Sequence, residues 1–311
     1  MKLLHSVKRR VAEPVRRLAR NFSATARLSS AISPYLPETV CVDVGASYYP
    51  HVKWRLFLDS PNTRWVAVEP NRANLGYLEQ WRFPSRVTAC TTGLSRDGGA
   101  QTLYVTNVDS GSSLLEPEIA PAMASRVRNL DYFFPVRPRT IETLTLAQVV
   151  AEQSADAPVF VKLDTQGAEL SILQGAQALL QAHRIVGIES ELSMLAQPMM
   201  KGSGKFWEAC GYLEGHGYEL LHVKPIYGPS RFGRSEPRGL TYLNECDAVF
   251  ALRRDVAQNL PVQHRAGLAA FYLCYGFREE VEAMLQEDRE LAAFLAGRGC
   301  DTAKLAALLG A

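Results

Sequence analysis

From residue 38 onward, short apolar runs alternate along the chain with stretches in which apolar residues recur at helical spacing. The apolar runs predict strands at residues 39–44, 65–68, 86–91, 101–105, 136–141, 159–163, 184–190, 218–223 and 247–252. The stretches between them predict helices, among others at residues 144–153, 168–182 and 206–215. Such alternation is typical of βαβ units. The pattern therefore predicts an α/β fold with a Rossmann-like, doubly wound and mostly parallel sheet of about seven core strands.

Both ends of the chain lie outside this alternation. Residues 1–37 place basic residues between apolar ones, as an amphipathic helix does, and such a helix could lie on an anionic membrane surface, contact another protein or pack on the domain. The basic side chains there are Lys8, Arg9, Arg10, Arg16, Arg17, Arg20 and Arg27. Residues 255–311 are helical in character, and their apolar side chains leave a homodimer open. We expect a domain at residues 38–254 between two helical appendages.

Composition and charge narrow the class of protein. The chain is 47% hydrophobic and 21% charged, which is typical of folded globular proteins rather than disordered ones. Its net charge of +2 argues against a nucleic-acid binder, in which basic residues dominate one face. The six cysteines form no Cys-x-x-Cys pair and give no metal-site spacing, and no apolar run reaches the roughly 18 residues of a membrane span. We expect a cytoplasmic protein without a metal site.

Two predicted strand ends carry residues suited to a nucleoside. The strand at 39–44 contains Asp43 and runs into a turn at Gly45, where the missing side chain lets the backbone approach a ligand. The strand at 65–68 is followed by Glu69 and Pro70, and a carboxylate there can accept hydrogen bonds from both ribose hydroxyls. Glu69 follows Asp43 by 26 residues, near the spacing of about 20 expected for such a pair. The two strand ends together predict nucleotide or nucleoside binding.

A third segment, residues 160–176, is more specific. It combines a strand, Asp164 and a helix opened by Gly167. With the two strand ends above, it resembles the FkbM family of methyltransferases, whose hallmark is a strand Lys-x-Asp followed by x-x-Gly-x-Glu and a helix ending in Leu-x-Gly-Ala. The matching residues are Lys162, Asp164, Gly167, Glu169, Leu173, Gly175 and Ala176, with shorter matches at Asp43, Gly45, Ala46, Glu69, Pro70, Gly93, Leu94, Ser95, Ser112, Ser113 and Leu114. The resemblance covers about residues 38 to 252.

This resemblance implies a class I methyltransferase fold and methyl transfer from S-adenosylmethionine to a hydroxyl oxygen, often on a sugar or a natural product. The cofactor-binding residues it implies are Asp43, Gly45, Ala46, Ser47, Glu69, Pro70, Gly93, Leu94, Ser112 and Asp164. Asp164 is the candidate catalytic residue, either as the base for the acceptor's proton or as a ligand of the cofactor's amino group. The family usually has a second glycine about four residues after the first, whereas residues 47–50 here are Ser-Tyr-Tyr-Pro, which does not support a second close backbone approach.

Further polar residues near predicted strand ends are candidates for the acceptor side. Glu189 and Glu191 end the strand at 184–190 and could contact the acceptor. His222 is the one histidine that the sequence places in a plausible site position, where it could act as a base or only satisfy a strand end. Lys162 and Glu169 are expected to make structural contacts.

Two other classes of function remain open from the sequence. A strand, a glycine turn and a strand-end acid also describe the site of an NAD-dependent oxidoreductase, although the full Gly-x-Gly-x-x-Gly is absent. The altered first turn and the appended helices would also suit a catalytically degenerate binding or scaffold protein that keeps the fold. A small-molecule or glycan acceptor is the partner we expect, and its identity is not encoded in any motif.

Overall fold

The computed structural model describes residues 27–310 apart from residues 81, 121–122, 124–126, 128 and 230–238. Residues 1–26, which make up most of the predicted N-terminal helical segment, therefore lie outside the described residues. A short 3-10 turn, η1 (Ser33–Tyr35), leads from the first described residues into the sheet.

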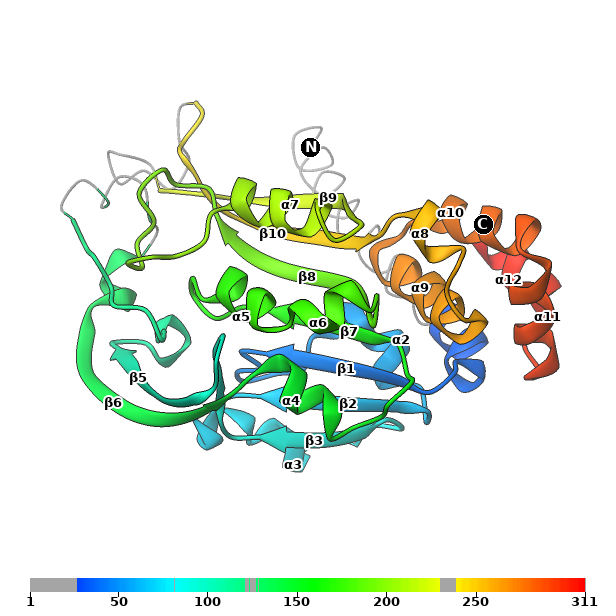
Figure 1. Ribbon diagram of the computed structural model, residues 1–311, viewed down its shortest axis with the longest axis horizontal. Helices are drawn as coiled ribbons and strands as arrows, with labels where there is room; N and C mark the ends of the chain where they lie inside the picture. The colour runs from blue at the N-terminus through cyan, green and yellow to red at the C-terminus, as the bar shows by residue number, and fades with distance from the viewer. Residues whose placement is uncertain are drawn as a thin grey trace, which may run out of the picture.

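A seven-stranded sheet forms the centre of the protein (Figure 1). Its strands are β1 (Thr39–Val44), β2 (Thr63–Val68), β3 (Arg86–Cys90), β7 (Val159–Leu163), β8 (Ile185–Ser193), β9 (Tyr218–Tyr227) and β10 (Leu243–Leu252), in the order β3-β2-β1-β7-β8-β10-β9. All neighbours are parallel except β10, which is antiparallel to both β8 and β9. The predicted mostly parallel sheet is confirmed. Strand β10 lies between β8 and β9 and is antiparallel to both. This arrangement differs from that of dinucleotide-binding sheets, whose parallel strands have the order 3-2-1-4-5-6.

The central strands are buried on both faces, which explains their nearly continuous apolar sequences. Every residue of β1 is buried, and β7 is buried except at Lys162. The segments that connect the strands form η2 (Val52–Trp54), α2 (Arg55–Leu58), η3 (Arg72–Leu75), α3 (Tyr77–Gln80), α4 (Leu146–Ala151), α5 (Glu169–Gly175), α6 (Gln177–Gln181) and α7 (Phe206–Glu214). The helix predicted at residues 168–182 is thus divided in two. At the junction Gly175 packs so tightly that a Cβ would lie 2.2 Å from the carbonyl oxygen of Arg96.

A second, smaller sheet lies at the end of the protein toward which the parallel strands point (Figure 1). It contains β4 (Gly93–Leu94), β5 (Gly99–Thr106) and β6 (Pro135–Leu144), in the order β4-β6-β5. Two of the predicted strands, at residues 101–105 and 136–141, therefore belong here and not to the central sheet. The loop that joins β5 to β6 contains the 3-10 turns η4 (Asp109–Gly111) and η6 (Leu130–Phe133). The small sheet consequently walls off the carboxyl ends of the central strands.

The C-terminal segment is helical, as predicted, but its first long helix belongs to the main core. The helices are α8 (Arg254–Ala257), α9 (Val262–Tyr275), α10 (Arg278–Glu287), α11 (Arg289–Gly297) and α12 (Thr302–Leu309). Helix α9 is buried over most of its length and packs on β8 and α2. The rings of Phe57, Phe160 and Phe271 stack in sequence, with centroids 4.5 and 5.5 Å apart. Helix α9 therefore covers the same sheet face as α2.

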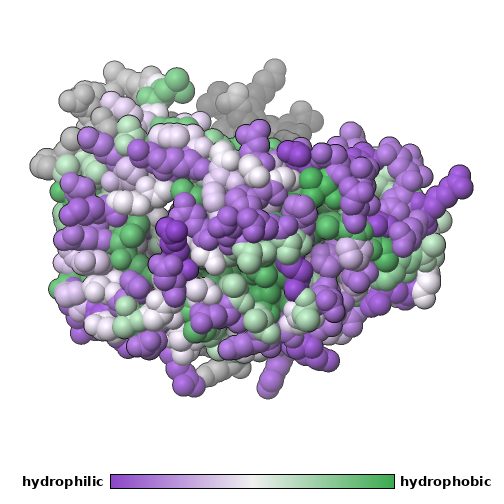
Figure 2. All heavy atoms as spheres, viewed as in Figure 1, coloured by the Kyte–Doolittle hydropathy of each residue, from purple (hydrophilic) through white to green (hydrophobic). Residues whose placement is uncertain are grey.

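The surface in Figure 2 is mainly hydrophilic, and hydrophobic residues show only in small areas between the hydrophilic ones. Within the described part of the chain, no helix is both long enough and apolar enough to cross a membrane.

We predict that Gly187→Ala destabilises the fold, because a Cβ at Gly187 would lie 2.7 Å from the ring of Phe271 on α9. Overpacking of this kind lowers the free energy of unfolding by about 1–3 kcal/mol. Urea denaturation followed by circular dichroism measures the change. Gly211→Ala on α7 is the matched control, because nothing lies within 4 Å of its Cβ position and alanine favours a helix by up to about 1 kcal/mol. Equal stability of the two variants would contradict the packing of α9 on β8.

Candidate functional site

Three charged residues form a row across the central strands. Asp43 on β1 is paired with Lys162 on β7, and Lys162 is paired with Glu189 on β8. Paired residues of neighbouring strands point to the same face of a sheet, so the three side chains lie side by side. The residues two positions earlier on β1, β7 and β8 belong to the packed face under α2 and α9. One sheet face therefore changes from apolar to charged toward the carboxyl ends of its strands.

Lys162 is the cation of this row. Its Nζ atom lies 3.6 Å from Asp43 Oδ1 and 3.2 Å from Asp164 Oδ2, and it donates a hydrogen bond of 3.3 Å to the carbonyl oxygen of Gly45. Burial opposes its charge, but the carboxylates of Asp164 and Asp43 outweigh this effect and raise the pKa of Lys162. Lys162 makes the structural contacts that were expected of it, and it also lines the cavity described below.

Gly45 is required at the first turn for a reason that the sequence did not reveal. Its φ is +76°, and a Cβ would stand 2.0 Å from the carbonyl oxygen of Asp164. The backbone NH of Asp164 in turn donates to the carbonyl oxygen of Val44. The glycine therefore allows the ends of β1 and β7 to approach each other, in addition to exposing backbone to a ligand.

A cavity of about 640 Å³ opens above these strand ends. Its walls contain all ten residues that were expected to bind the cofactor: Asp43, Gly45, Ala46, Ser47, Glu69, Pro70, Gly93, Leu94, Ser112 and Asp164. Residues from β5, β6, β9 and β10 also reach it, among them Arg137, Arg139 and Lys224. The structure thus brings the separate sequence segments into one space whose size is typical of ligand sites.

Glu69 presents a free carboxylate oxygen to this cavity. Its Oε1 accepts a hydrogen bond of 2.8 Å from the backbone NH of Asn71, and among the described residues no hydrogen bond reaches Oε2. Burial, with a contribution from the charge of Asp109, raises the pKa of Glu69 despite that hydrogen bond. The side chain is therefore held in place by one oxygen and offers the other to a donor.

Two buried polar atoms of the cavity wall lack a hydrogen-bond partner among the described residues: Asp43 Oδ1 and Ser47 Oγ. Buried polar atoms in folded proteins are nearly always paired. Both atoms can accept a hydrogen bond, and Asp43 carries a negative charge next to the first turn. A ligand with a positively charged donor, such as an amino group, would supply the hydrogen bonds that these two atoms lack.

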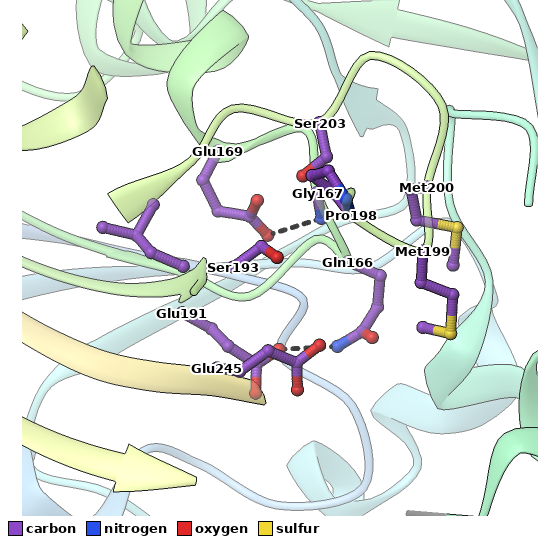
Figure 3. A pocket seen from close by; sticks show the side chains of 11 residues that line it. Gln166, Gly167, Glu169, Glu191, Ser193, Pro198, Met199, Met200, Ser203 and Glu245 are labelled. Carbon is purple, nitrogen blue, oxygen red and sulfur yellow. Dashed lines mark hydrogen bonds between the residues drawn. The ribbon is translucent and has the colours of Figure 1, made fainter. Parts of the chain in front are cut away.

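Asp164, which lines the large cavity, is also joined by hydrogen bonds to a group of neighbouring side chains. Its Oδ1 accepts a hydrogen bond of 3.0 Å from Gln166 Nε2, which also donates to Glu191 at 2.7 Å. Figure 3 shows Gln166 and Glu191 with Glu245 around a second, much smaller cavity of about 20 Å³. Burial disfavours the charge on Asp164, but Lys162 and the hydrogen bonds lower its pKa. Burial and the charge of Asp164 raise the pKa of Glu191 instead.

Glu169 holds the loop that follows β7. Its Oε1 accepts hydrogen bonds from the backbone NH and the hydroxyl of Thr165, at 2.7 and 3.0 Å, and from the backbone NH of Gly167 at 3.1 Å. These bonds explain why the segment needs an acid at position 169. Position 167 needs a glycine for a different reason, because its backbone φ is +109°. The structural role expected for Glu169 agrees with these contacts.

Among the described histidines, the one that lines the cavity is His51, not His222. His222 is exposed on the edge strand β9 and does not line the cavity. The alternative in which His222 acts as a base at this site is therefore wrong. The Nε2 atom of His51 lies 2.7 Å from Glu189 Oε2. His51 follows the first turn in an irregular segment without a strand end or motif, so no local pattern marked it. Only the folded chain brings it to Glu189, 138 residues away.

Glu189 and Glu191, which the sequence placed together on the acceptor side, line different cavities in the structure. Glu189 lines the large cavity, whereas Glu191 lines the small one. Lys53 Nζ lies 2.6 Å from Glu189 Oε1. Burial would raise the pKa of Glu189, but its interactions with His51 and Lys53 outweigh burial and lower that pKa to about 2. Glu189 is therefore a permanent anion at neutral pH.

Several solved structures show distant similarity to this chain. A precorrin-6y C5,15-methyltransferase from Geobacter metallireducens GS-15 is 16% identical, with 74% of this chain and 88% of that chain covered and a TM-score of 0.34. A SAM-dependent methyltransferase from Anabaena variabilis ATCC 29413 is 12% identical, with 73% and 82% covered and a TM-score of 0.31. Similarity at this level establishes nothing about the acceptor. No curated protein matches the sequence.

The sequence profile of the methyltransferase FkbM domain matches residues 43–220. The matched region runs from Asp43 on β1 into β9 and contains all ten predicted cofactor-binding residues. It covers more than half of the chain. The chain therefore belongs to the FkbM methyltransferase family, whose methyl donor is S-adenosylmethionine.

Proposed function

We propose that this methyltransferase transfers the methyl group to a hydroxyl oxygen of a sugar or a natural product. The observation that carries the proposal is the large cavity, in which residues suited to a nucleoside and an amino acid adjoin a further polar wall. A cofactor would occupy the side formed by β1, β2, β4 and β7. The walls from β5, β6, β8 and β9 are then left for an acceptor.

The residues present fit S-adenosylmethionine, which supplies an electrophilic methyl group on its sulfonium. Glu69, with Oε2 free, would accept hydrogen bonds from the ribose hydroxyls. Asp43 Oδ1 and Ser47 Oγ, which accept no hydrogen bond from any described residue, would accept hydrogen bonds from the amino group. We assign Asp164 to the same group as a cofactor-orienting residue, because its low pKa and its contacts with Lys162 and Gln166 make it a weak base.

The remaining cavity wall supports a polar acceptor. Tyr48 and Tyr49 are 52% and 65% exposed and border the cavity, so their rings could pack against a sugar ring. Arg137 and Arg139 also border it, and within the described residues neither forms an ion pair. Guanidinium groups donate hydrogen bonds to hydroxyl and carboxylate oxygens.

The remaining sequence-based expectations are part of this proposal. They are the division into residues 1–37, 38–254 and 255–311, a cytoplasmic location, a peripheral membrane or protein contact through the basic N-terminal segment, and a homodimer. A protein of this family without turnover would bind the cofactor and yield no methylated product, so product formation separates an enzyme from a scaffold.

We predict that the protein binds S-adenosylhomocysteine at micromolar strength and that Glu69→Gln and Asp43→Asn each weaken binding by about 10-fold to 100-fold. Hydrogen bonds to a charged group contribute about 1.5–3 kcal/mol. Isothermal calorimetry measures the affinity. Asp97→Asn is the control, because Asp97 is exposed and lies outside the cavity. Binding of NAD in place of S-adenosylhomocysteine would contradict the proposal.

We also predict that the affinity for S-adenosylhomocysteine falls toward acid pH through Glu69. The ligand needs the ionised carboxylate, and burial raises the pKa of Glu69. Affinity should therefore begin to fall at a pH above the value of about 4.3 that is ordinary for glutamate. Calorimetry between pH 8 and pH 5 measures this, and circular dichroism confirms that the protein stays folded. An unchanged pH dependence in Glu69→Gln would rule out Glu69 as its source.

A further inference from the structure

We infer that His51 is the base that takes the proton from the acceptor hydroxyl, and that Glu189 and Tyr275 are the residues that position its ring. This inference rests on the proposed function, since it assigns a step of that methyl transfer. It also assigns a role at the site to the C-terminal helix α9, which lies outside the residues matched by the family.

The backbone places His51 next to the cofactor side of the cavity. Its backbone NH donates a hydrogen bond of 3.3 Å to Asp43 Oδ2, and Asp43 is the acid at the end of β1. The ring lines the cavity and is 14% exposed. An imidazole in this position lies beside the cofactor and still faces the space left for an acceptor.

Glu189 determines which ring nitrogen is available. Because a carboxylate only accepts hydrogen bonds, the contact of 2.7 Å with Glu189 Oε2 assigns the proton to His51 Nε2. Among the described residues no hydrogen bond reaches Nδ1. The ring is further held edge-on to Trp54, with centroids 5.2 Å apart. His51 thus has one nitrogen fixed by the protein and one that can accept a proton.

Glu189 is itself held by three donors. Lys53 contacts Oε1 at 2.6 Å, while His51 and the hydroxyl of Tyr275 both contact Oε2. Trp54 Nε1 donates to the Tyr275 hydroxyl at 2.7 Å, so that hydroxyl directs its own proton to Glu189. These three donors fix the position of the Glu189 carboxylate, against which the ring of His51 is oriented.

The step balances without any further reactant. As the acceptor oxygen forms its bond to the methyl carbon, the bond from carbon to sulfur breaks and its electron pair stays on sulfur. The hydroxyl proton passes to Nδ1 of His51 and is later released to water. The imidazolium formed during the step is stabilised by the neighbouring Glu189 anion, as in other carboxylate–histidine pairs.

The test measures directly which nitrogen of the His51 ring carries a proton, and it needs no acceptor. Full-length, ¹⁵N-labelled protein is saturated with S-adenosylhomocysteine at pH 8, and long-range ¹H–¹⁵N spectra of its six histidines are recorded. The signal lost in His51→Asn belongs to His51. We expect a neutral ring with its proton on Nε2. Glu189→Gln and Tyr275→Phe should shift this ring toward a mixture of both neutral tautomers.

Tyr272→Phe is the matched control, because Tyr272 is a buried tyrosine of the same helix that does not line the cavity, and it should leave the His51 signal unchanged. A proton on Nδ1, or on both nitrogens, in the wild-type complex would overturn the assignment of the base. Failure to bind S-adenosylhomocysteine at all would instead overturn the proposed function. The two failures are therefore distinguishable.

Kinetics with any hydroxyl acceptor that is turned over provides the second readout. His51→Asn should lower kcat by about 10²-fold to 10⁴-fold, the range for loss of a general base, while the affinity for S-adenosylhomocysteine stays the same. His222→Asn, on the exposed edge of β9, should keep wild-type kcat. An equal kcat for the two histidine variants would refute the role of His51.

Discussion

The buried charge of Lys162 is the constraint on which the site depends. A charge inside a protein costs several kcal/mol unless opposite charges and hydrogen bonds compensate it. Here Asp43, Asp164 and the carbonyl oxygen of Gly45 do so. They come from β1 and from the turns that follow β1 and β7, so compensation requires that these two strands lie side by side in this register. The same ion pairs fix two of the residues that we assign to the cofactor.

The sheet face that carries Lys162 divides into an apolar and a charged part. Phe160 lies two residues before Lys162 on β7, and it stacks between Phe57 and Phe271. Because side chains alternate along a strand, Phe160 and Lys162 point to the same face. Helix α9 covers the apolar part with Phe271 and reaches the charged part with Tyr275. Stability of the core and order at the site therefore depend on the same C-terminal helix.

The first turn, whose sequence departs from the family pattern, is held by hydrogen bonds from neighbouring segments. Tyr48 adopts a φ of 68°, a conformation that a residue with a Cβ takes only at a cost of about 1–3 kcal/mol. Its backbone NH donates to the carbonyl oxygen of Asn74 at 2.9 Å, and the hydroxyl of Tyr77 donates to the carbonyl oxygen of Ala46. The segment after β2 thus holds the turn in place, and the exposed ring of Tyr48 borders the cavity.

The sequence by itself determined the strand–helix alternation and the mostly parallel sheet, because both depend on local apolar runs. It also identified ten of the residues that line the cavity, through a turn glycine, acids at strand ends and short motifs shared with the FkbM family. Only the tertiary structure decided that His51 and not His222 faces the site, that Gly45 makes room for Asp164, and that Tyr275 of α9 contacts Glu189. These contacts join residues that are far apart along the chain and have no periodicity. They exist only because packing of α9 on the sheet and the register of β1, β7 and β8 bring the side chains together.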